Sequence, residues 1–287
     1  SFALEPVLPQ DAVQQFERDG FIFPIRVMDR GDAIAVARKI GRIKESYAHL
    51  PRVDHDHKLF RFKPHLKYTC LDAIVHNARV LDAVEALIGP DILLWTSTLF
   101  IKDAHNPAYI GWHQDSYTYP LDGDEVVNVW VALTDATLEN GAMRFFKGSN
   151  GLVPLDHAET WEEYHLGSRG ETVDTGVNDE RVVDVLLEAG QASIHHVDLI
   201  HSSQPNRSGE RRIGYAIRYI PARLRDTTRR GTAMLVRGED RYGHWELEPR
   251  PSVDYDPRVM PIYERAMGIR SDASLGDNET DRAFTEA

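Results

Sequence analysis

The sequence predicts a mainly β fold with helices at its start. In the first ninety residues apolar side chains recur at helical spacing, whereas after Pro90 short runs rich in Val, Ile, Thr and aromatic residues alternate with turn residues. No Pro-, Gly- or Ser-rich linker divides the interior of the chain. Because such runs are typical of sandwiches and barrels, we expect a single domain in which helices accompany a β core.

Three helices are predicted before the β region. They span residues 10–19, 32–49 and 71–88. The first ends at Gly20, a residue type that often closes helices, and Asp32 is a candidate N-cap of the second. The third stops at Gly89-Pro90, which cannot continue a helix.

The strand candidates follow in order, separated by turn residues. They are 91–104, 125–135, 142–147, 191–197 and 211–220. Asn140-Gly141 is a strong hairpin signal and predicts that the second and third strands pair with each other. The polar stretch 161–180 predicts a long surface loop.

One domain, 1–269, is expected to contain all these elements. Its predicted parts are a mostly helical segment 1–90, a β core 91–222 and a C-terminal extension 223–269, followed by a disordered tail 270–287.

Composition narrows the class of partner. With 33 Lys and Arg against 45 Asp and Glu, the net charge of −12 disfavours nucleic acid. No apolar stretch approaches the roughly 18 residues of a membrane span, and no basic-then-apolar leader opens the sequence. The single cysteine, Cys70, cannot form an intrachain disulfide. We expect a cytoplasmic protein, monomer or homodimer, that binds a small molecule.

The segment Gly111-Trp112-His113-Gln114-Asp115 suggests a metal site. In an extended strand His113 and Asp115, two residues apart, point to the same face. His201 is the best third ligand, and two imidazoles with one carboxylate form the facial triad of non-haem Fe(II) sites, which leaves open positions for a co-substrate and O₂.

Other histidines compete for the ligand role. His195 and His196 lie close to His201, but only His201 has an arginine, Arg212, eleven residues later. We therefore expect alanine substitution of His195 or His196 to retain iron, and of His201 to lose it. The His-x-His pair in 54–57 is interpreted as part of a solvated loop.

The run that begins at Arg212 suggests an anion site. In a strand Arg212, Gly214, Ala216 and Arg218 share one face, and the alternating apolar residues share the other. The two small residues leave room for a ligand, and each guanidinium offers bidentate recognition of a carboxylate. A dicarboxylate co-substrate would satisfy Arg212.

These motifs together resemble the phytanoyl-CoA dioxygenase family of Fe(II)- and 2-oxoglutarate-dependent oxygenases. The resemblance rests on Phe16-Glu17-Arg18-Asp19-Gly20-Phe21, Gly111-Trp112-His113-Gln114-Asp115, Trp130-Val131-Ala132-Leu133, Glu139-Asn140-Gly141-Ala142-Met143 and His201-Ser202-Ser203-Gln204-Pro205-Asn206-Arg207-Ser208. It implies a double-stranded β-helix, the jelly-roll core also found in cupins, with helices outside. It also implies hydroxylation of an unactivated carbon, with consumption of O₂ and release of succinate and CO₂.

The resemblance also implies roles for individual residues. It assigns His113, Asp115 and His201 to iron, and Arg212 and Ser203 to the distal carboxylate of 2-oxoglutarate. Further residues expected near the co-substrate are Trp130, Thr98 and Lys102. Because relatives that chlorinate have a small residue at the carboxylate position, Asp115 favours hydroxylation over halogenation.

For the substrate we expect a small, anionic metabolite or natural-product intermediate. Arg218 is the candidate anion ligand, and Arg229 or Arg230 is expected to assist it. Further candidates for the pocket wall are Tyr117, Tyr119 and Thr96. Two alternatives stay open: a cupin-like metal enzyme that does not use 2-oxoglutarate, and a non-catalytic module that binds a small molecule.

Overall fold

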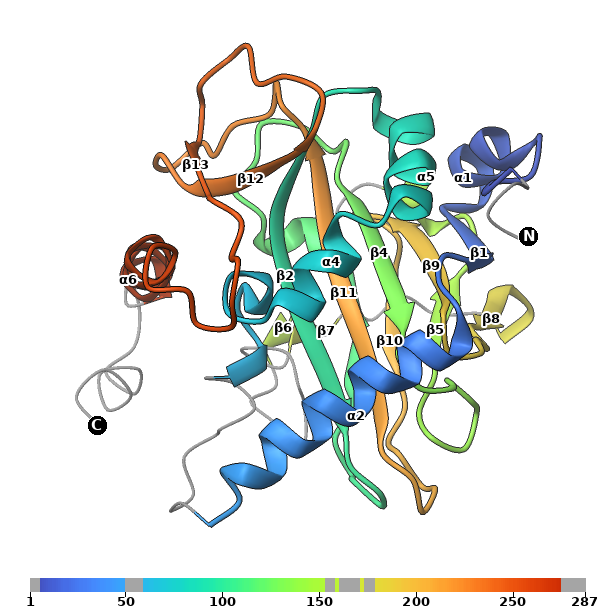
Figure 1. Ribbon diagram of the computed structural model, residues 1–287. Helices are drawn as coiled ribbons and strands as arrows, with labels where there is room; N and C mark the ends of the chain where they lie inside the picture. The colour runs from blue at the N-terminus through green and yellow to red at the C-terminus, as the bar shows by residue number, and fades with distance from the viewer. Residues whose placement is uncertain (1–5, 50–58, 153–157, 160–170, 173–178, 275–287) are drawn as a thin grey trace.

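The strand-forming runs after Pro90 assemble into two sheets, which lie in the middle of the molecule (Figure 1). The structure is a computed structural model. It describes residues 6–49, 59–152, 158–159, 171–172 and 179–274.

The larger sheet has seven strands and includes a long central strand, β11. In spatial order the strands are β1 (Phe21–Arg26), β9 (Gln191–His196), β4 (Val127–Ala132), β11 (Arg212–Pro221), β2 (Ile92–Lys102), β12 (Thr232–Arg237) and β13 (Glu246–Leu247). Neighbouring strands are antiparallel except β12 and β13.

The smaller sheet has four antiparallel strands. In spatial order they are β3 (Ile110–His113), β10 (His201–Ser203), β5 (Met143–Phe146) and β8 (Val182–Asp184). Two short strands, β6 (Ala158–Glu159) and β7 (Glu171–Thr172), pair separately. The two sheets with helices beside them confirm the expected mainly β fold with flanking helices.

Helices cover the outer face of the larger sheet (Figure 1). The α-helices are α1 (Ala12–Asp19), α2 (Arg30–Ser46), α4 (Thr69–Val75), α5 (Ala78–Ile88) and α6 (Met260–Ser274), and the short 3₁₀ helices are η2 (Pro64–Leu66), η3 (Asp115–Thr118), η4 (Ser149–Gly151) and η5 (Asp179–Arg181). The main core lies between this sheet and the helices, where Tyr215 and Tyr219 of β11 are fully buried. The Tyr219 hydroxyl donates to the carbonyl of Val75 at 2.8 Å, which ties α4 to the sheet.

Two predicted helices differ in their ends. The second begins at Arg30 rather than Asp32, because the extended residue before it is Asp29. The third is two helices, α4 and α5, with a break at residues 76–77. The break has a local cause: the Asn77 side chain accepts hydrogen bonds from the backbone N–H groups of Arg79 and Val80, at 3.0 and 3.2 Å, and so starts a new helix.

The five strand candidates are all strands, but the predicted hairpin at Asn140-Gly141 is wrong. β4 belongs to the larger sheet and β5 to the smaller one, so the turn carries the chain between sheets. Gly141 has a φ of +85°, and a Cβ there would lie 2.3 Å from the carbonyl oxygen of Gln204. The turn signal is therefore real, whereas the pairing that it predicted is not.

Strands outside 91–222 also join the larger sheet. β1 forms one edge and β12 pairs with β2 on the other side, so the helical segment and the C-terminal extension both contribute to the β core. The first residues of the predicted tail 270–287 belong to α6, which continues to Ser274. The rest of the tail, most of the loop 161–180 and the pair in 54–57 lie outside the described residues. Within those residues, no helix is long and apolar enough to cross a bilayer.

Candidate active site

The structure brings His113, Asp115 and His201 together. His113 and His201 are register partners on β3 and β10, and one ligand atom from each of the three side chains lies within 4.8 Å of the other two. The Oδ1 atom of Asp115 is 3.3 Å from Nε2 of His113 and 3.8 Å from Nε2 of His201. Asp115 reaches this position from the helix η3, since β3 ends at His113 and does not continue as the sequence suggested.

Hydrogen bonds to the backbone fix the tautomers of both histidines. Nδ1 of His113 lies 2.9 Å from the carbonyl of Gly111, and Nδ1 of His201 lies 2.8 Å from the carbonyl of Leu199. A carbonyl only accepts, so each Nδ1 carries the proton and each Nε2 keeps its lone pair for a metal. With one carboxylate oxygen, this donor set fits a divalent iron ion.

The charge states of Asp115 and His201 also suit metal binding. Burial alone would raise the pKa of Asp115, but His201, His113, His195 and Arg218 hold it well below the usual value, so the carboxylate stays ionised. Burial lowers the pKa of His201 far below that of a free imidazole, which keeps the ring neutral.

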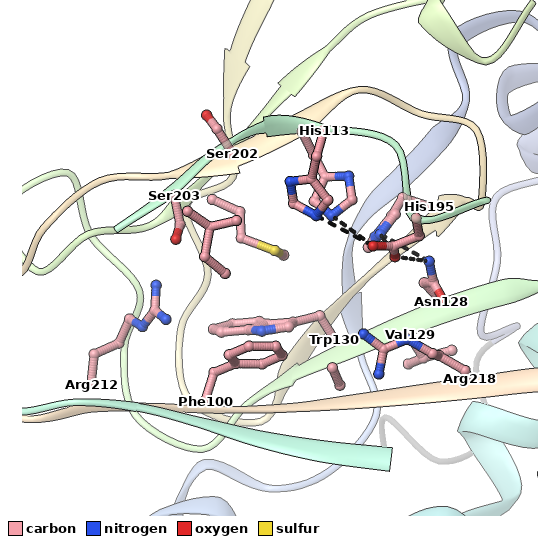
Figure 2. A pocket seen from close by; sticks show the side chains of 15 residues that line it. Phe100, His113, Asn128, Val129, Trp130, His195, Ser202, Ser203, Arg212 and Arg218 are labelled. Atoms are coloured by element: carbon pink, nitrogen blue, oxygen red, sulfur yellow. Dashed lines mark hydrogen bonds and ion pairs between the residues drawn. The ribbon is translucent and has the colours of Figure 1, made fainter. Parts of the chain in front are cut away.

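These residues face a pocket between the two sheets. It has about 520 Å³ of empty space, part of which is open to solvent, and its walls include Phe100, Trp130 and Met143. Figure 2 shows Arg212 and Arg218 at opposite ends of the pocket, with Trp130 and Phe100 between them.

Two buried basic side chains lie at the Arg212 end of the site. Arg212 and Lys102 are both buried, and in the described part of the chain neither forms an ion pair with a carboxylate. Lys102 donates to the Ser203 hydroxyl at 2.8 Å and to the carbonyl of Gln204, and Arg212 donates to the carbonyl of Gly141. Burial lowers the pKa of Arg212 to about 10. Burial and the nearby Arg212 charge lower the pKa of Lys102 to about 6.

Trp130 occupies the space expected to be open over β11. A Cβ on Gly214 would lie 1.7 Å from Cζ2 of the indole, so the glycine makes room for Trp130 and not directly for a ligand. The Arg212 guanidinium lies over the same ring, 5.3 Å from its centroid. The indole therefore forms a wall beside Arg212, where the resemblance placed an aromatic residue.

The Arg218 end holds a further basic side chain. Arg218 donates to the hydroxyl of Tyr119 and, at 3.3 Å, to that of Thr98, and it has no carboxylate ion pair among the residues described. Thr98, expected beside the co-substrate, thus lies at the opposite end. By contrast, the neighbouring arginines 223, 225, 237 and 241 all pair with carboxylates, as surface arginines commonly do.

Two expected wall residues lie differently from the prediction. Tyr117 is 47% exposed, because η3 turns the chain after His113 and ends the strand alternation. Thr96 is the register partner of Arg218 on β2 but is not part of the pocket lining.

Sequence reasoning did not identify Asn128 as a pocket residue. Asn128 lies on β4, two residues before Trp130, and its amide contacts Asp115. The strand alternation could have found it, because a polar residue on the same face as Trp130 must also face the pocket. His195 lines the pocket too, whereas the adjacent His196 packs against Phe16 with ring centroids 5.9 Å apart.

Comparison with known proteins agrees with this geometry. The family model described as phytanoyl-CoA dioxygenase (PhyH) matches residues 3–214. The chain belongs to the phytanoyl-CoA dioxygenase family. This membership confirms the resemblance and, at the level of the family, the enzyme class and its cofactors Fe(II) and 2-oxoglutarate.

Curated relatives align over part of their length. The chain is 31% identical over 159 residues to "Probable alpha-ketoglutarate-dependent hypophosphite dioxygenase" of Stutzerimonas stutzeri, covering 53% of this chain and 55% of the relative. It is 29% identical over 167 residues to the L-proline trans-4-hydroxylase of Streptomyces griseoviridis, covering 51% and 61%. The aligned part therefore spans less than two thirds of these relatives.

Solved structures align over more of the chain. The apo non-heme monooxygenase ThoJ is 35% identical, with a TM-score of 0.80 and coverage of 91% of this chain and 96% of ThoJ. CytC3, solved with Fe(II) and alpha-ketoglutarate, is 22% identical with a TM-score of 0.62, covering 84% and 93%, and shares the fold. These matches agree with the expected double-stranded β-helix.

Proposed function

We propose that this protein is an Fe(II)- and 2-oxoglutarate-dependent dioxygenase that hydroxylates an unactivated carbon of a small anionic metabolite or natural-product intermediate. The observation that carries the proposal is that the triad His113, Asp115 and His201 shares one pocket with two arginines. These are the buried Arg212 and the half-buried Arg218, and neither forms an ion pair with a carboxylate among the described residues. When bound, the metal and 2-oxoglutarate supply the oxidising chemistry, which yields the hydroxylated product, succinate and CO₂.

Each part of the pocket has a separate task in this proposal. His113, Asp115 and His201 hold the metal from one side and leave the pocket side open. Arg212 and Lys102 bind the distal carboxylate, with the Ser203 hydroxyl beside them. The carboxylate of Asp115 occupies the position that a halide would need, which favours hydroxylation.

Arg218 is proposed to bind the substrate. Arg218 is half-buried and forms no ion pair with a carboxylate among the described residues, although the charge of Asp115 acts on it, so a guanidinium in this place favours an anionic ligand. Tyr119 and Thr98 fix its orientation. Two relatives support an acidic substrate, since hypophosphite is an anion and proline carries a carboxylate.

The co-substrate is tested first. Fe(II) and 2-oxoglutarate are added without oxygen, and the weak visible absorption of the iron–2-oxoglutarate chelate is recorded. We expect the band in the wild type, no band in His201→Ala, and an apparent 2-oxoglutarate affinity at least about 30-fold weaker in Arg212→Ala, because a buried charge loses its partner. His196→Ala is the control and keeps the band. A wild type without a band would favour the cupin-like enzyme or the binding module.

The substrate end is tested by screening small acids for succinate release. Arg218→Ala is expected to raise the substrate KM by about 10- to 100-fold, the worth of a charged hydrogen bond, and to leave the 2-oxoglutarate KM nearly unchanged. Arg223→Ala removes an arginine that pairs with Glu125 on the surface and serves as the control. Equal effects of Arg218→Ala on both KM values would contradict the assignment.

A further inference from the structure

Asn128 lies between the metal-binding carboxylate and a third histidine of the pocket. It is 3% exposed on β4, and its Nδ2 atom is 2.7 Å from Oδ2 of Asp115 and 3.2 Å from Nε2 of His195. Figure 2 shows both contacts as dashed lines that meet at Asn128. One amide group therefore contacts two side chains that compete for the same region of the site.

The contact with Asp115 fixes the orientation of the amide. An amide oxygen turned toward an ionised carboxylate would be repelled, so the nitrogen faces Asp115, and Oδ1 of Asn128 has no hydrogen-bond partner among the described residues. An amide nitrogen only donates. Nε2 of His195 then accepts through its lone pair, which places the His195 proton on Nδ1, a buried atom without a hydrogen-bond partner among the described residues.

His195 lies beside the triad but outside the group of three side chains whose ligand atoms are all within 4.8 Å of one another. Its ring centroid lies 4.6 Å from that of His201, and its Nε2 atom lies 3.8 Å from Oδ2 of Asp115. The side chain is buried and packs against Phe145, with ring centroids 5.2 Å apart. A neutral imidazole in this place would be a fourth ligand if its lone pair were free.

The Asn128 amide also determines which oxygen of Asp115 faces the other metal-binding side chains. Oδ2 is held by Asn128, whereas Oδ1 faces Nε2 of His113 and of His201. The carboxylate thus presents one oxygen to the metal. On this side of the site the protein supplies three ligands, and the other potential ligand atom, Nε2 of His195, is already engaged.

We propose that Asn128 is a positioning residue that keeps His195 out of the metal coordination sphere. The inference rests on the proposed function, because an octahedral ion with three protein ligands has the three free positions that bidentate 2-oxoglutarate and O₂ require. A fourth ligand from His195 would occupy one of them. Asn128 prevents this by donating to the lone pair through which His195 would bind.

The first test counts the coordinated imidazoles. The protein is loaded with Cu(II) alone, without 2-oxoglutarate, and pulsed electron paramagnetic resonance is used to count the imidazoles bound to the metal. We expect two in the wild type, two in His195→Phe, three in Asn128→Leu and two in the double variant. Leucine keeps the branched shape of asparagine without its hydrogen-bonding groups, and phenylalanine keeps a planar aromatic ring without the lone pair of histidine.

The second test uses the affinity for 2-oxoglutarate of the Fe(II)-loaded protein without oxygen. We expect Asn128→Leu to weaken it by about 10-fold or more, as a lost contact to a metal ligand does, and the added His195→Phe substitution to restore most of the loss. A purely structural role of Asn128 predicts no rescue.

The outcomes separate this inference from the proposed function. Three imidazoles in the wild type, two in Asn128→Leu, or a double variant as weak as Asn128→Leu would each overturn the role of Asn128. If Asn128→Leu does not fold, the comparison of wild type with His195→Phe still decides, because a drop in the imidazole count would place His195 on the metal. A wild type that binds Cu(II) through two imidazoles but gives no Fe(II)–2-oxoglutarate band would contradict the proposed function and leave the role of Asn128 standing.

Discussion

Lys102 carries a buried amino group beside the buried guanidinium of Arg212. It is fully buried, and burial with the neighbouring Arg212 lowers its pKa to about 6. Between this value and the ordinary lysine pKa of about 10.4, the unfolded chain binds a proton that the folded protein without co-substrate does not bind. The stability of the empty protein therefore falls as the pH falls through this range, and the loss is complete below about pH 6.

This pH dependence is testable with Lys102→Met, which keeps the aliphatic stem and removes the titrating group. The free energy of unfolding of the variant minus that of the wild type should increase as the pH is lowered from about 10 to about 6, and stay constant below. Urea unfolding without metal and 2-oxoglutarate measures it. A difference that does not change with pH would show that Lys102 keeps an ordinary pKa in the fold.

Gly214 is the second residue with a clear test. In Gly214→Ala the new Cβ would overlap the indole of Trp130, so the ring must move from the wall of the proposed anion site. We expect a loss of about 1–3 kcal/mol in stability and a weaker affinity for 2-oxoglutarate. Gly209→Ala is the matched control, because a Cβ there meets nothing within 4 Å. An unchanged 2-oxoglutarate affinity in Gly214→Ala would mean that Trp130 does not shape this site.

At the residue scale, the sequence predicted which side chains share one face of a strand. The order of residues from Arg212 to Arg218 was enough to place both arginines on one face, and the structure has both in the pocket lining. The position of Thr98 and the contacts of Asn128 were not predictable in this way. They depend on which strand lies beside which, since Thr98 meets Arg218 from β2 and Asn128 meets Asp115 from β4.

At the scale of elements, the limits of helices are set by single side chains. The Asn77 side chain accepts two backbone hydrogen bonds at the start of α5 and donates to the carbonyl of Val27 at 3.1 Å. Asn77→Ala should lower the free energy of unfolding by about 1 to 2 kcal/mol, as the loss of an N-cap does. Thermal or urea unfolding tests this. Asn77→Asp, which keeps the capping oxygen, should recover a large part, and equal losses in both variants would contradict the capping role.

Pairing between elements was less predictable than the elements themselves. The runs after Pro90 contain enough β-branched and aromatic residues to predict strands, but Asn140-Gly141 says only that the chain turns. Whether the chain turns within one sheet or crosses to the other depends on how the hydrophobic faces of all the strands pack against one another. β4 has both faces buried in the larger sheet, which leaves β5 to pair with β10 and β8.

For the whole molecule, the C-terminal part is held by a buried charged group. Glu248 accepts from Lys63 and, at 2.7 Å, from the Thr232 hydroxyl, and lies 3.1 Å from Nε2 of His65. Although burial opposes its ionisation, Lys63 and His65 lower its pKa to about 2. These contacts join the segment after β12 to the chain just before α4.

Removing the Glu248 carboxylate should destabilise the whole domain. Glu248→Ala leaves Lys63 buried without its carboxylate, so we expect a loss of about 3–5 kcal/mol, whereas Glu246→Ala removes an exposed pair with Arg265 and should cost less than about 1 kcal/mol. Calorimetry compares the two variants. Similar small losses in both variants would contradict the role of Glu248 in holding the C-terminal part.

The site is divided between the two sheets of the molecule. The two histidines belong to β3 and β10 of the smaller sheet, and both arginines belong to β11 of the larger one. In the proposed function, metal binding and the choice of acid are therefore encoded in separate layers, which the Asn128 amide connects. If Arg218 binds the substrate as proposed, a different acid would be accepted after changes in the layer that carries residue 218, while the histidines across the pocket keep their own backbone contacts.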